Sequence, residues 1–263
     1  MYDFNYTQAK NVDEAASTFG SASDASYLAG GMTLIPTLKQ RLAAPSDLID
    51  LGKIGDLEGI TVSGDSVRIG AMTRHAVVAA SAEVQKAIPA LAKLAGGIGD
   101  PMVRNRGTMG GSIANNDPAA DYPAAVVGLG ATVHTSKRDI AGDDFFTGMF
   151  ETALEPGEIV TGVTYPIPDK AAYVKFPNPA SRYAIVGAFV SKTGGEVRVA
   201  VTGAGPCVFR ADEMEKALAG DFSAKAIENI KVPADGLNSD IHATAEYRAN
   251  LVTVIAKRAV AEA

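Results

Sequence analysis

One stretch of the sequence, residues 104–123, concentrates residue types that could bind an anion. Its three glycines stand around the hydroxyl residue Thr108, and two aspartates follow within a few residues. Glycine allows positive φ and lets a ligand approach main-chain N–H groups closely, so that successive N–H groups can converge on one anion. A phosphate is the anion that such a loop would most readily bind. On residue types alone, a tight glycine turn between two packed elements fits equally well.

A second glycine pair, Gly30 and Gly31, interrupts a short apolar run and is followed by apolar residues at helical spacing. This pattern predicts a strand at residues 27–29, a glycine turn, and a helix over residues 32–42. The first N–H groups of a helix have no partner within it and favour negative charge. Two glycine clusters with hydroxyl residues suit a diphosphate better than either cluster alone.

Several groups of residues resemble one known family. The residues that carry the likeness are Ala-Gly-Gly-Met-Thr at 29–33, Gly-Thr-Met-Gly-Gly-Ser at 107–112 and Asp-Pro-Ala-Ala-Asp-Tyr-Pro at 117–123. They are similar to the two FAD-pyrophosphate signatures of the medium, flavin-binding subunit of molybdenum hydroxylases, the family of carbon monoxide dehydrogenase and xanthine dehydrogenase. The likeness continues in order through residues 157–166, 173–176 and 182–186, and therefore covers most of the chain.

The resemblance implies a role for individual residues in holding FAD. The first signature would give main-chain N–H groups and the Thr33 hydroxyl to the pyrophosphate, and the second would hold the same diphosphate from the other side. Asp121 would accept from a ribityl or ribose hydroxyl, and Lys175 would lie near the isoalloxazine or its phosphate. Tyr183 could lie in the loop that covers the ring. The implied cofactor residues, with Ile98 and Val160 as apolar walls for the ring, are Ala29, Gly30, Gly31, Met32, Thr33, Leu34, Ile98, Thr108, Gly110, Gly111, Ser112, Asp121, Val160 and Lys175.

The activity that the resemblance implies is electron transfer. In this family a large subunit with a molybdenum–pterin cofactor oxidises the substrate, and a small subunit with two [2Fe–2S] clusters passes the electrons on. The flavin subunit delivers them to NAD, quinone or oxygen. This chain would be that oxidoreductase subunit, would assemble with both partners, and would not choose the substrate. Flavin suits the task because it accepts single electrons and can release a pair.

Two other classes of protein stay open. The first is a self-contained FAD-dependent oxidoreductase on the same scaffold, similar to the UDP-N-acetylmuramate reductases, although no convincing catalytic acid stands outside the glycine stretches. The second is a non-redox binding module that keeps the glycine turns for packing. No residue is assigned as catalytic or as a metal ligand, because the three histidines lie far apart and Cys207 is the single cysteine. Electrons that leave a flavin here would need a partner.

Length and composition limit which classes of protein this chain can belong to. With 263 residues, of which 47% are hydrophobic, the chain can bury a sizeable core in two or three small subdomains. A formal charge of −6 without a long run of Lys or Arg argues against a nucleic-acid surface. No apolar segment approaches the length of a membrane span, and the N-terminus lacks the charged and apolar regions of a secretory signal. We therefore expect a cytoplasmic globular protein.

The element patterns predict an α+β fold with three units. We expect FAD-binding subdomain 1 at residues 1–55, FAD-binding subdomain 2 at residues 56–168 and a C-terminal sheet-and-helix domain at residues 169–263. The resemblance implies a FAD-binding fold of the vanillyl-alcohol-oxidase/PCMH type for the first two. The predicted helices cover residues 12–19, 32–42, 74–80, 89–95, 124–129, 212–219, 224–229 and 242–261. The predicted strands cover residues 27–29, 48–51, 60–62, 67–69, 131–134, 158–165, 180–190 and 196–201.

Overall fold

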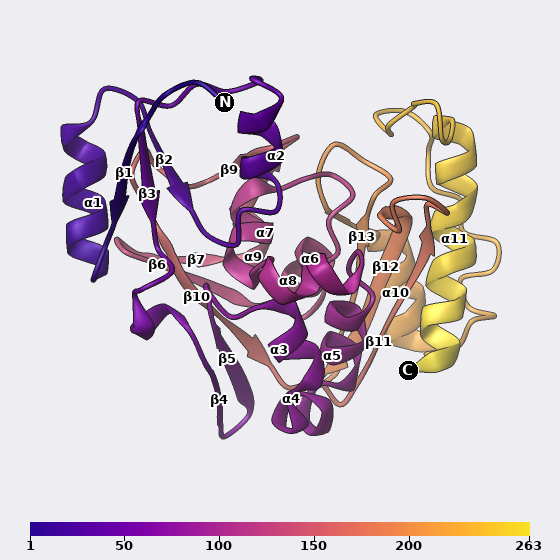
Figure 1. Cartoon of the computed structure of the whole chain (residues 1–263). Coiled ribbons are helices and arrows are strands. Elements are labelled where there is room, and N and C mark those ends of the chain that lie inside the picture. The colour runs from indigo at the N-terminus through magenta and orange to yellow at the C-terminus, as the bar shows by residue number, and fades with distance from the viewer.

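Three main sheets follow one another along the chain (Figure 1), and residues 146–152 form a small two-stranded sheet in addition. The computed structural model describes all of residues 1–263. The helices are α1 Val12–Ser21, α2 Leu34–Lys39, α3 His75–Ala80, α4 Ala82–Ala87, α5 Pro89–Gly96, α6 Pro101–Arg106, α7 Met109–Asn115, α8 Tyr122–Gly128, α9 Gly142–Phe145, α10 Asp212–Gly220 and α11 Ala245–Glu262, with a 3-10 turn η1 at Gly55–Leu57. The strands are β1 Asn5–Gln8, β2 Ala25–Leu28, β3 Asp47–Asp50, β4 Ile60–Ser63, β5 Ser66–Gly70, β6 Thr132–Thr135, β7 Asp139–Ala141, β8 Phe146–Gly148, β9 Glu151–Thr152, β10 Val160–Pro166, β11 Lys170–Pro177, β12 Ala184–Thr193, β13 Glu196–Thr202 and β14 Phe209–Arg210.

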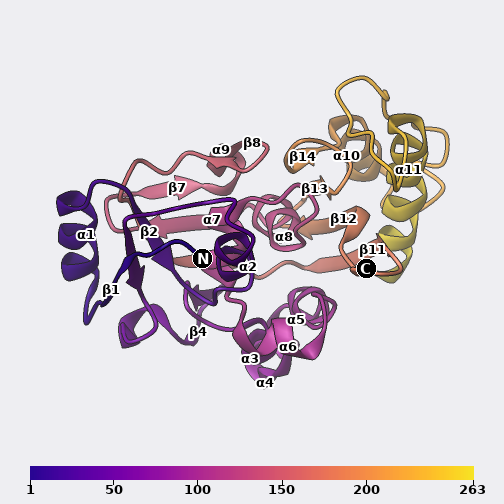
Figure 2. The same ribbon diagram turned by 45° about the horizontal axis from the view of Figure 1, so that its top comes forward.

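The first sheet is small and parallel, with strand order β1-β3-β2. Helix α1 connects β1 to β2, and it begins at Asn11, whose side chain accepts a hydrogen bond of 2.8 Å from the Glu14 N–H. Helix α2 connects β2 to β3. This unit lies at one end of the molecule and the C-terminal unit at the other (Figure 2).

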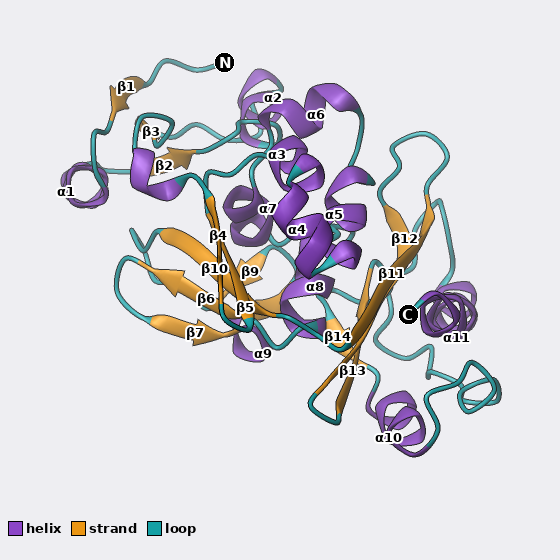
Figure 3. Ribbon diagram, turned by 90° about the horizontal axis from the view of Figure 1, so that it is seen from below, coloured by secondary structure: helices purple, strands orange, loops and turns teal.

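The second sheet is antiparallel and has the order β4-β5-β10-β6-β7. Its first two strands, predicted at residues 60–62 and 67–69, form a hairpin in which Gly64 takes a φ of +59°. Helices α3 to α8 occupy the space between this sheet and the third one (Figure 3). The chain segments that follow α5 and α6 therefore lie at the junction of all three units.

The third sheet, β11-β12-β13-β14, carries helices on both faces. Helices α10 and α11 cover one face, and α5 and α8 contact the other (Figures 1 and 3). Alternate residues of each strand point to opposite faces. On β12, for example, Val190 belongs to the cluster under α11, whereas Phe189 belongs to the central core. None of the helices is both long and apolar enough to cross a membrane.

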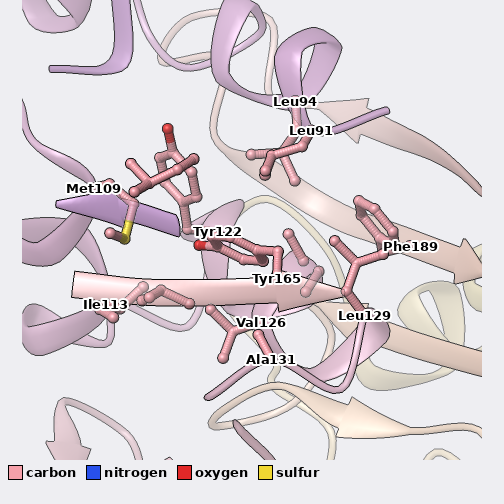
Figure 4. Packing of buried hydrophobic residues seen from close by; sticks show 14 of the residues in the cluster. Leu91, Leu94, Met109, Ile113, Tyr122, Val126, Leu129, Ala131, Tyr165 and Phe189 are labelled. Carbon is pink, nitrogen blue, oxygen red and sulfur yellow. The ribbon is translucent and has the colours of Figure 1, made fainter. Parts of the chain in front are cut away.

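The central core joins the second unit to the C-terminal sheet. Its largest fully buried side chains include Tyr122, Tyr165 and Phe189, from α8, β10 and β12 (Figure 4). Burial of a large apolar side chain contributes about 1.5–3 kcal/mol, so this shared cluster holds the two units together. Gly128 at the end of α8 has no room for a side chain, because a Cβ there would lie 2.9 Å from the Phe189 ring.

The α+β fold class is confirmed, with corrections to individual elements. Each of the three sheets lies within one of the ranges 1–55, 56–168 and 169–263, but the domain boundaries themselves stay a prediction. Helix α2 is shorter than the predicted 32–42, and residues 224–229 form turns instead of a helix. The glycine stretch at 107–112 is not a loop, because most of it belongs to helix α7.

Candidate functional site

The loop between β2 and α2 presents a row of backbone donors. No protein group accepts a hydrogen bond from the N–H groups of residues 30–34, five in succession. The first satisfied N–H group is that of Ile35, which donates to the Gly31 carbonyl at 3.0 Å. Gly31 makes the turn with a φ of +75°, a conformation that favours glycine. A row of unpartnered N–H groups at a glycine turn can bind an anion.

The two glycine stretches lie against one another. A Cβ at Gly30 would lie 2.1 Å from the Arg106 carbonyl oxygen and 2.8 Å from Gly107 Cα, so only glycine fits there. On the same side, a Cβ at Gly111 would lie 3.4 Å from that of Ala29. The juxtaposition that the sequence analysis expected is therefore present.

The second stretch offers fewer donors than expected. The N–H groups of Met109 and Gly110 donate to the carbonyls of Thr73 and Ala71 at 3.0 and 2.8 Å, and the others are also satisfied except that of Thr108. Gly110 serves packing, because a Cβ there would lie 2.5 Å from that of Ala71. The donors of this stretch that no protein group engages are the Thr108 N–H group and the Ser112 hydroxyl, and the role of residues 108–112 in holding a diphosphate stays a prediction.

A cleft of about 320 Å³ lies elsewhere on the chain's surface, and no residue of either glycine stretch (29–34 and 107–112) lines it. Its walls are the α5–α6 connection, the start of α8 and the loop after β11. Ile98 lines it, as predicted for an apolar wall, and the half-exposed Tyr183 stands at its mouth. The lining residues are Ile98, Gly99, Asp100, Val103, Asp121, Pro179, Ala180, Ser181, Arg182 and Tyr183.

Asp121 is buried at the edge of this cleft and is already engaged. One carboxylate oxygen accepts from the Tyr173 hydroxyl, and the other accepts from Lys175 Nζ at 3.0 Å. Lys175 Nζ also donates to the Gly97 carbonyl at 2.9 Å. Burial raises the pKa of Asp121, while the Lys175 ammonium and the Tyr173 hydroxyl act to lower it. Lys175 Nζ is thus engaged by a carboxylate and a carbonyl, and its position near the isoalloxazine or its phosphate stays a prediction.

Two further side chains lie apart from the cleft lining. Val160 is only 6% exposed and belongs to the central core, so its role as a wall for the ring stays a prediction. His75 is buried beneath the second glycine stretch, and its backbone N–H donates to the Gly107 carbonyl at 3.0 Å. Burial, together with the Arg104 guanidinium, lowers the pKa of His75 to about 4, so the imidazole is neutral at pH 7.

Several residues in the cleft, and Tyr173 beside Asp121, have no role in the prediction from the sequence. Tyr173 is separated from Asp121 by 52 positions, and no local pattern relates the two. Asp100 and Val103 did carry a signal, because Asp100 followed by Pro101 is a common helix start. In the structure the Asp100 side chain accepts from the Val103 N–H at 2.9 Å and begins α6.

Comparison with known proteins covers nearly the whole chain. Residues 2–168 match the model of the FAD binding domain in molybdopterin dehydrogenase, and residues 171–263 match the CO dehydrogenase flavoprotein C-terminal domain. The chain is 36% identical to the carbon monoxide dehydrogenase medium chain of Afipia carboxidovorans, with 99% of this chain and 96% of the relative covered. It is 34% identical to the nicotine 6-hydroxylase medium subunit of Paenarthrobacter nicotinovorans, with 98% and 96% covered.

Solved structures of proteins similar in sequence also superpose on nearly the whole chain. A chain of the reconstituted CO dehydrogenase from Oligotropha carboxidovorans superposes with a TM-score of 0.90 at 34% identity, covering 99% of this chain and 97% of that one. A chain of quinoline 2-oxidoreductase from Pseudomonas putida superposes with a TM-score of 0.89 at 31% identity, covering 99% and 96%.

Proposed function

Since this chain belongs to the family of FAD-binding medium subunits of molybdenum hydroxylases, we propose that it binds FAD and passes electrons from an iron–sulfur subunit to an acceptor. The observation that carries the proposal is the row of five unpartnered N–H groups at residues 30–34. A diphosphate supplies the anionic oxygens that such a row needs. The relatives include subunits named for carbon monoxide, nicotine and xanthine, so family membership does not fix the substrate of the complex.

We assign the groups that would hold the cofactor as follows. The N–H row, the Thr33 and Ser112 hydroxyls and the Thr108 N–H group would hold the diphosphate. Gly30 lets the two stretches approach, and a side chain there would fill the space between them. Ile98 would pack against the ring in the cleft. Bound FAD would supply a redox centre that takes electrons singly and releases a pair.

The group formed by Asp121, Tyr173 and Lys175 would fix the shape of the cleft. Tyr173 and Lys175 belong to β11, whereas Asp121 begins α8 and Gly97 follows α5. Their hydrogen bonds therefore connect the C-terminal sheet to two walls of the flavin cleft. Each carboxylate oxygen has one lone pair left, so Asp121 would still accept from a ribityl or ribose hydroxyl.

The proposal also includes assembly of this chain with two partner subunits. The relatives are medium subunits or chains of larger enzymes. We infer that this chain joins a small [2Fe–2S] subunit and a large molybdenum–pterin subunit in the cytoplasm, with residues 1–55, 56–168 and 169–263 as its three units. Substrate oxidation would take place on the large subunit.

The test compares three flavins that differ in phosphate content. Riboflavin has no phosphate, FMN has one, and FAD has the diphosphate that the N–H row fits. We expect the purified chain to bind FAD at least a hundredfold more tightly than FMN, measured by quenching of flavin fluorescence. Equal affinity for all three would mean that residues 30–34 do not bind the diphosphate.

A second test separates the relay from the self-contained oxidoreductase. The isolated FAD-loaded chain should show no turnover with small oxidisable substrates, and should accept electrons when its iron–sulfur and molybdenum partners are added. Substrate turnover by the isolated chain would favour the self-contained enzyme.

A further inference from the structure

A second cleft, of about 410 Å³, lies on the other side of the loop that covers the flavin cleft. The β8–β9 hairpin, the loop at 178–185, the segment at 238–242 and helix α11 form its walls. Ser181 and Tyr183 line both clefts. A molecule in the second cleft would therefore be separated from a flavin in the first by no more than these side chains.

One wall of the second cleft is apolar and partly exposed. Met149, Phe150 and Tyr183 are 49%, 57% and 47% exposed. Phe150 holds a φ of +57°, which is unusual for a residue other than glycine and costs on the order of 1 kcal/mol. Its N–H donates to the Asn116 carbonyl at 3.1 Å, and the buried Asn116 amide donates to the carbonyls of Gly148 and Glu151. The fold thus holds an aromatic ring at the surface in a strained conformation, as is common at ligand sites.

The second cleft also offers a hydrogen-bond donor. Asn178 is 7% exposed, and its Oδ1 accepts from the N–H groups of Ala180 and Ser181 at 2.9 and 3.1 Å. Its Nδ2 donates to no protein group. A nearly buried amide donor beside an apolar wall is suited to a ligand carbonyl oxygen.

The charges of the second cleft argue against a dinucleotide. Two carboxylates, those of Asp117 and Asp240, line this cleft together with the guanidinium of Arg248. That guanidinium already donates to Asp240 at 2.6 Å and to the carbonyls of Ile185 and Gly203. The wall therefore has no free cation for the diphosphate of NAD, and its net charge would repel one.

We propose that the second cleft binds a neutral planar electron acceptor of the quinone class, with its ring against Phe150 and Tyr183 and a carbonyl oxygen on Asn178 Nδ2. The proposal rests on the proposed function, because bound FAD is the electron donor. The quinone takes two electrons from reduced FAD and two protons from water, and becomes the hydroquinone. Reduced FAD returns to its oxidised form and releases its protons to water.

The test measures binding of tetramethyl-1,4-benzoquinone to the full chain loaded with FAD, by calorimetry. This quinone has no free ring position that the Cys207 thiol could attack. We expect saturable binding, about tenfold weaker in Phe150→Gly because one stacking face is lost. Glycine tolerates the positive φ of this position, so the variant should fold at least as well as the wild type. Arg41→Gly, at another positive-φ residue (φ 61°) outside the second cleft, should bind the quinone as the wild type does.

A second variant tests the donor. Asn178→Asp keeps the acceptor oxygen for Ala180 and Ser181 but replaces the free amide with a carboxylate, so quinone binding should weaken by tenfold or more. Unaltered quinone affinity in both variants, or no binding to the wild type, would overturn the proposal. Competition of NAD with the quinone would also overturn it. FAD content, read from visible absorbance, distinguishes these outcomes from failure of the flavin site: a chain that keeps FAD but binds no quinone refutes this inference alone.

Discussion

Substitution of Gly30 by alanine tests the contact between the two glycine stretches. The new Cβ would lie 2.1 Å from the Arg106 carbonyl oxygen, whereas ordinary contact begins near 3.4 Å. The loops must therefore separate by about 1.3 Å, the difference between these distances. An N–H···O hydrogen bond of about 2.9 Å does not survive a shift of that size. Loss of two hydrogen bonds to charged phosphate oxygens, at roughly 1.5 kcal/mol each, would weaken FAD binding about a hundredfold.

The control for this substitution is Gly142→Ala. Its Cβ would lie 2.8 Å from a Val126 methyl group and 2.9 Å from the Ala131 carbonyl oxygen, in α9, which contributes nothing to the N–H row. Both variants should lose about 1–3 kcal/mol of stability through overpacking. Only Gly30→Ala should lose FAD affinity, measured by fluorescence titration at a temperature where circular dichroism shows both variants folded. Wild-type FAD affinity in Gly30→Ala, or an equal loss in Gly142→Ala, would refute the reasoning.

Three further predictions concern groups around the site. Because the pKa of His75 falls from its usual 6.5 to about 4 on folding, the unfolded chain binds more protons between these values. The stability of the wild type should therefore fall by roughly 3 kcal/mol as the pH drops from 6.5 to 4, relative to His75→Gln, in urea unfolding; parallel pH profiles would contradict this. Lys175→Met leaves the Asp121 carboxylate buried without its cation, and should cost about 3 kcal/mol of unfolding free energy. Adding Asp121→Asn should restore part of that loss, and a double variant less stable than Lys175→Met would argue against the pair. Ser191→Ala removes the buried 2.6 Å hydrogen bond to the Gly128 carbonyl and should lower stability by about 1–2 kcal/mol; an unchanged unfolding midpoint would show that the bond contributes nothing.

Local patterns predicted the elements whose signals lie within a few residues. Asn11 begins α1 as expected, and the hairpin at residues 60–69 follows from a polar turn between two alternating runs. Gly31 occupies a positive φ, as a glycine turn requires. In each case the hydrogen bonds or dihedral angles involve residues close together in the sequence, so a short sequence pattern is enough to predict them.

The second glycine stretch shows why local patterns can mislead. Glycines allow positive φ and a close approach of ligands, so the pattern at residues 107–112 predicts a glycine turn. In the structure Met109 and Ile113, four residues apart, are both fully buried, and the close approach of Ala71 leaves no room for a side chain at Gly110. Tertiary packing therefore overrides the local pattern here, and it uses N–H groups that a loop would have left free.

Contacts between distant segments could not be predicted from residue patterns. Lys175 and Asp121 were each assigned to the site through the family resemblance, but the ion pair between them joins positions 54 apart. The Tyr173 hydroxyl completes this group; Tyr173 lies within the family likeness at residues 173–176, but no role follows for it from the sequence. The unpartnered Asn178 amide is likewise visible only in the folded chain, because it depends on which acceptors the fold leaves within reach.

The visible absorption spectrum of the purified chain tests the central claim most directly, with the flavin identified after mild denaturation. We predict a flavin spectrum, or its appearance when FAD is added, with one releasable FAD per chain. A colourless protein that takes up no FAD, alone or with its partner subunits, would contradict the assignment of residues 30–34 as the diphosphate site.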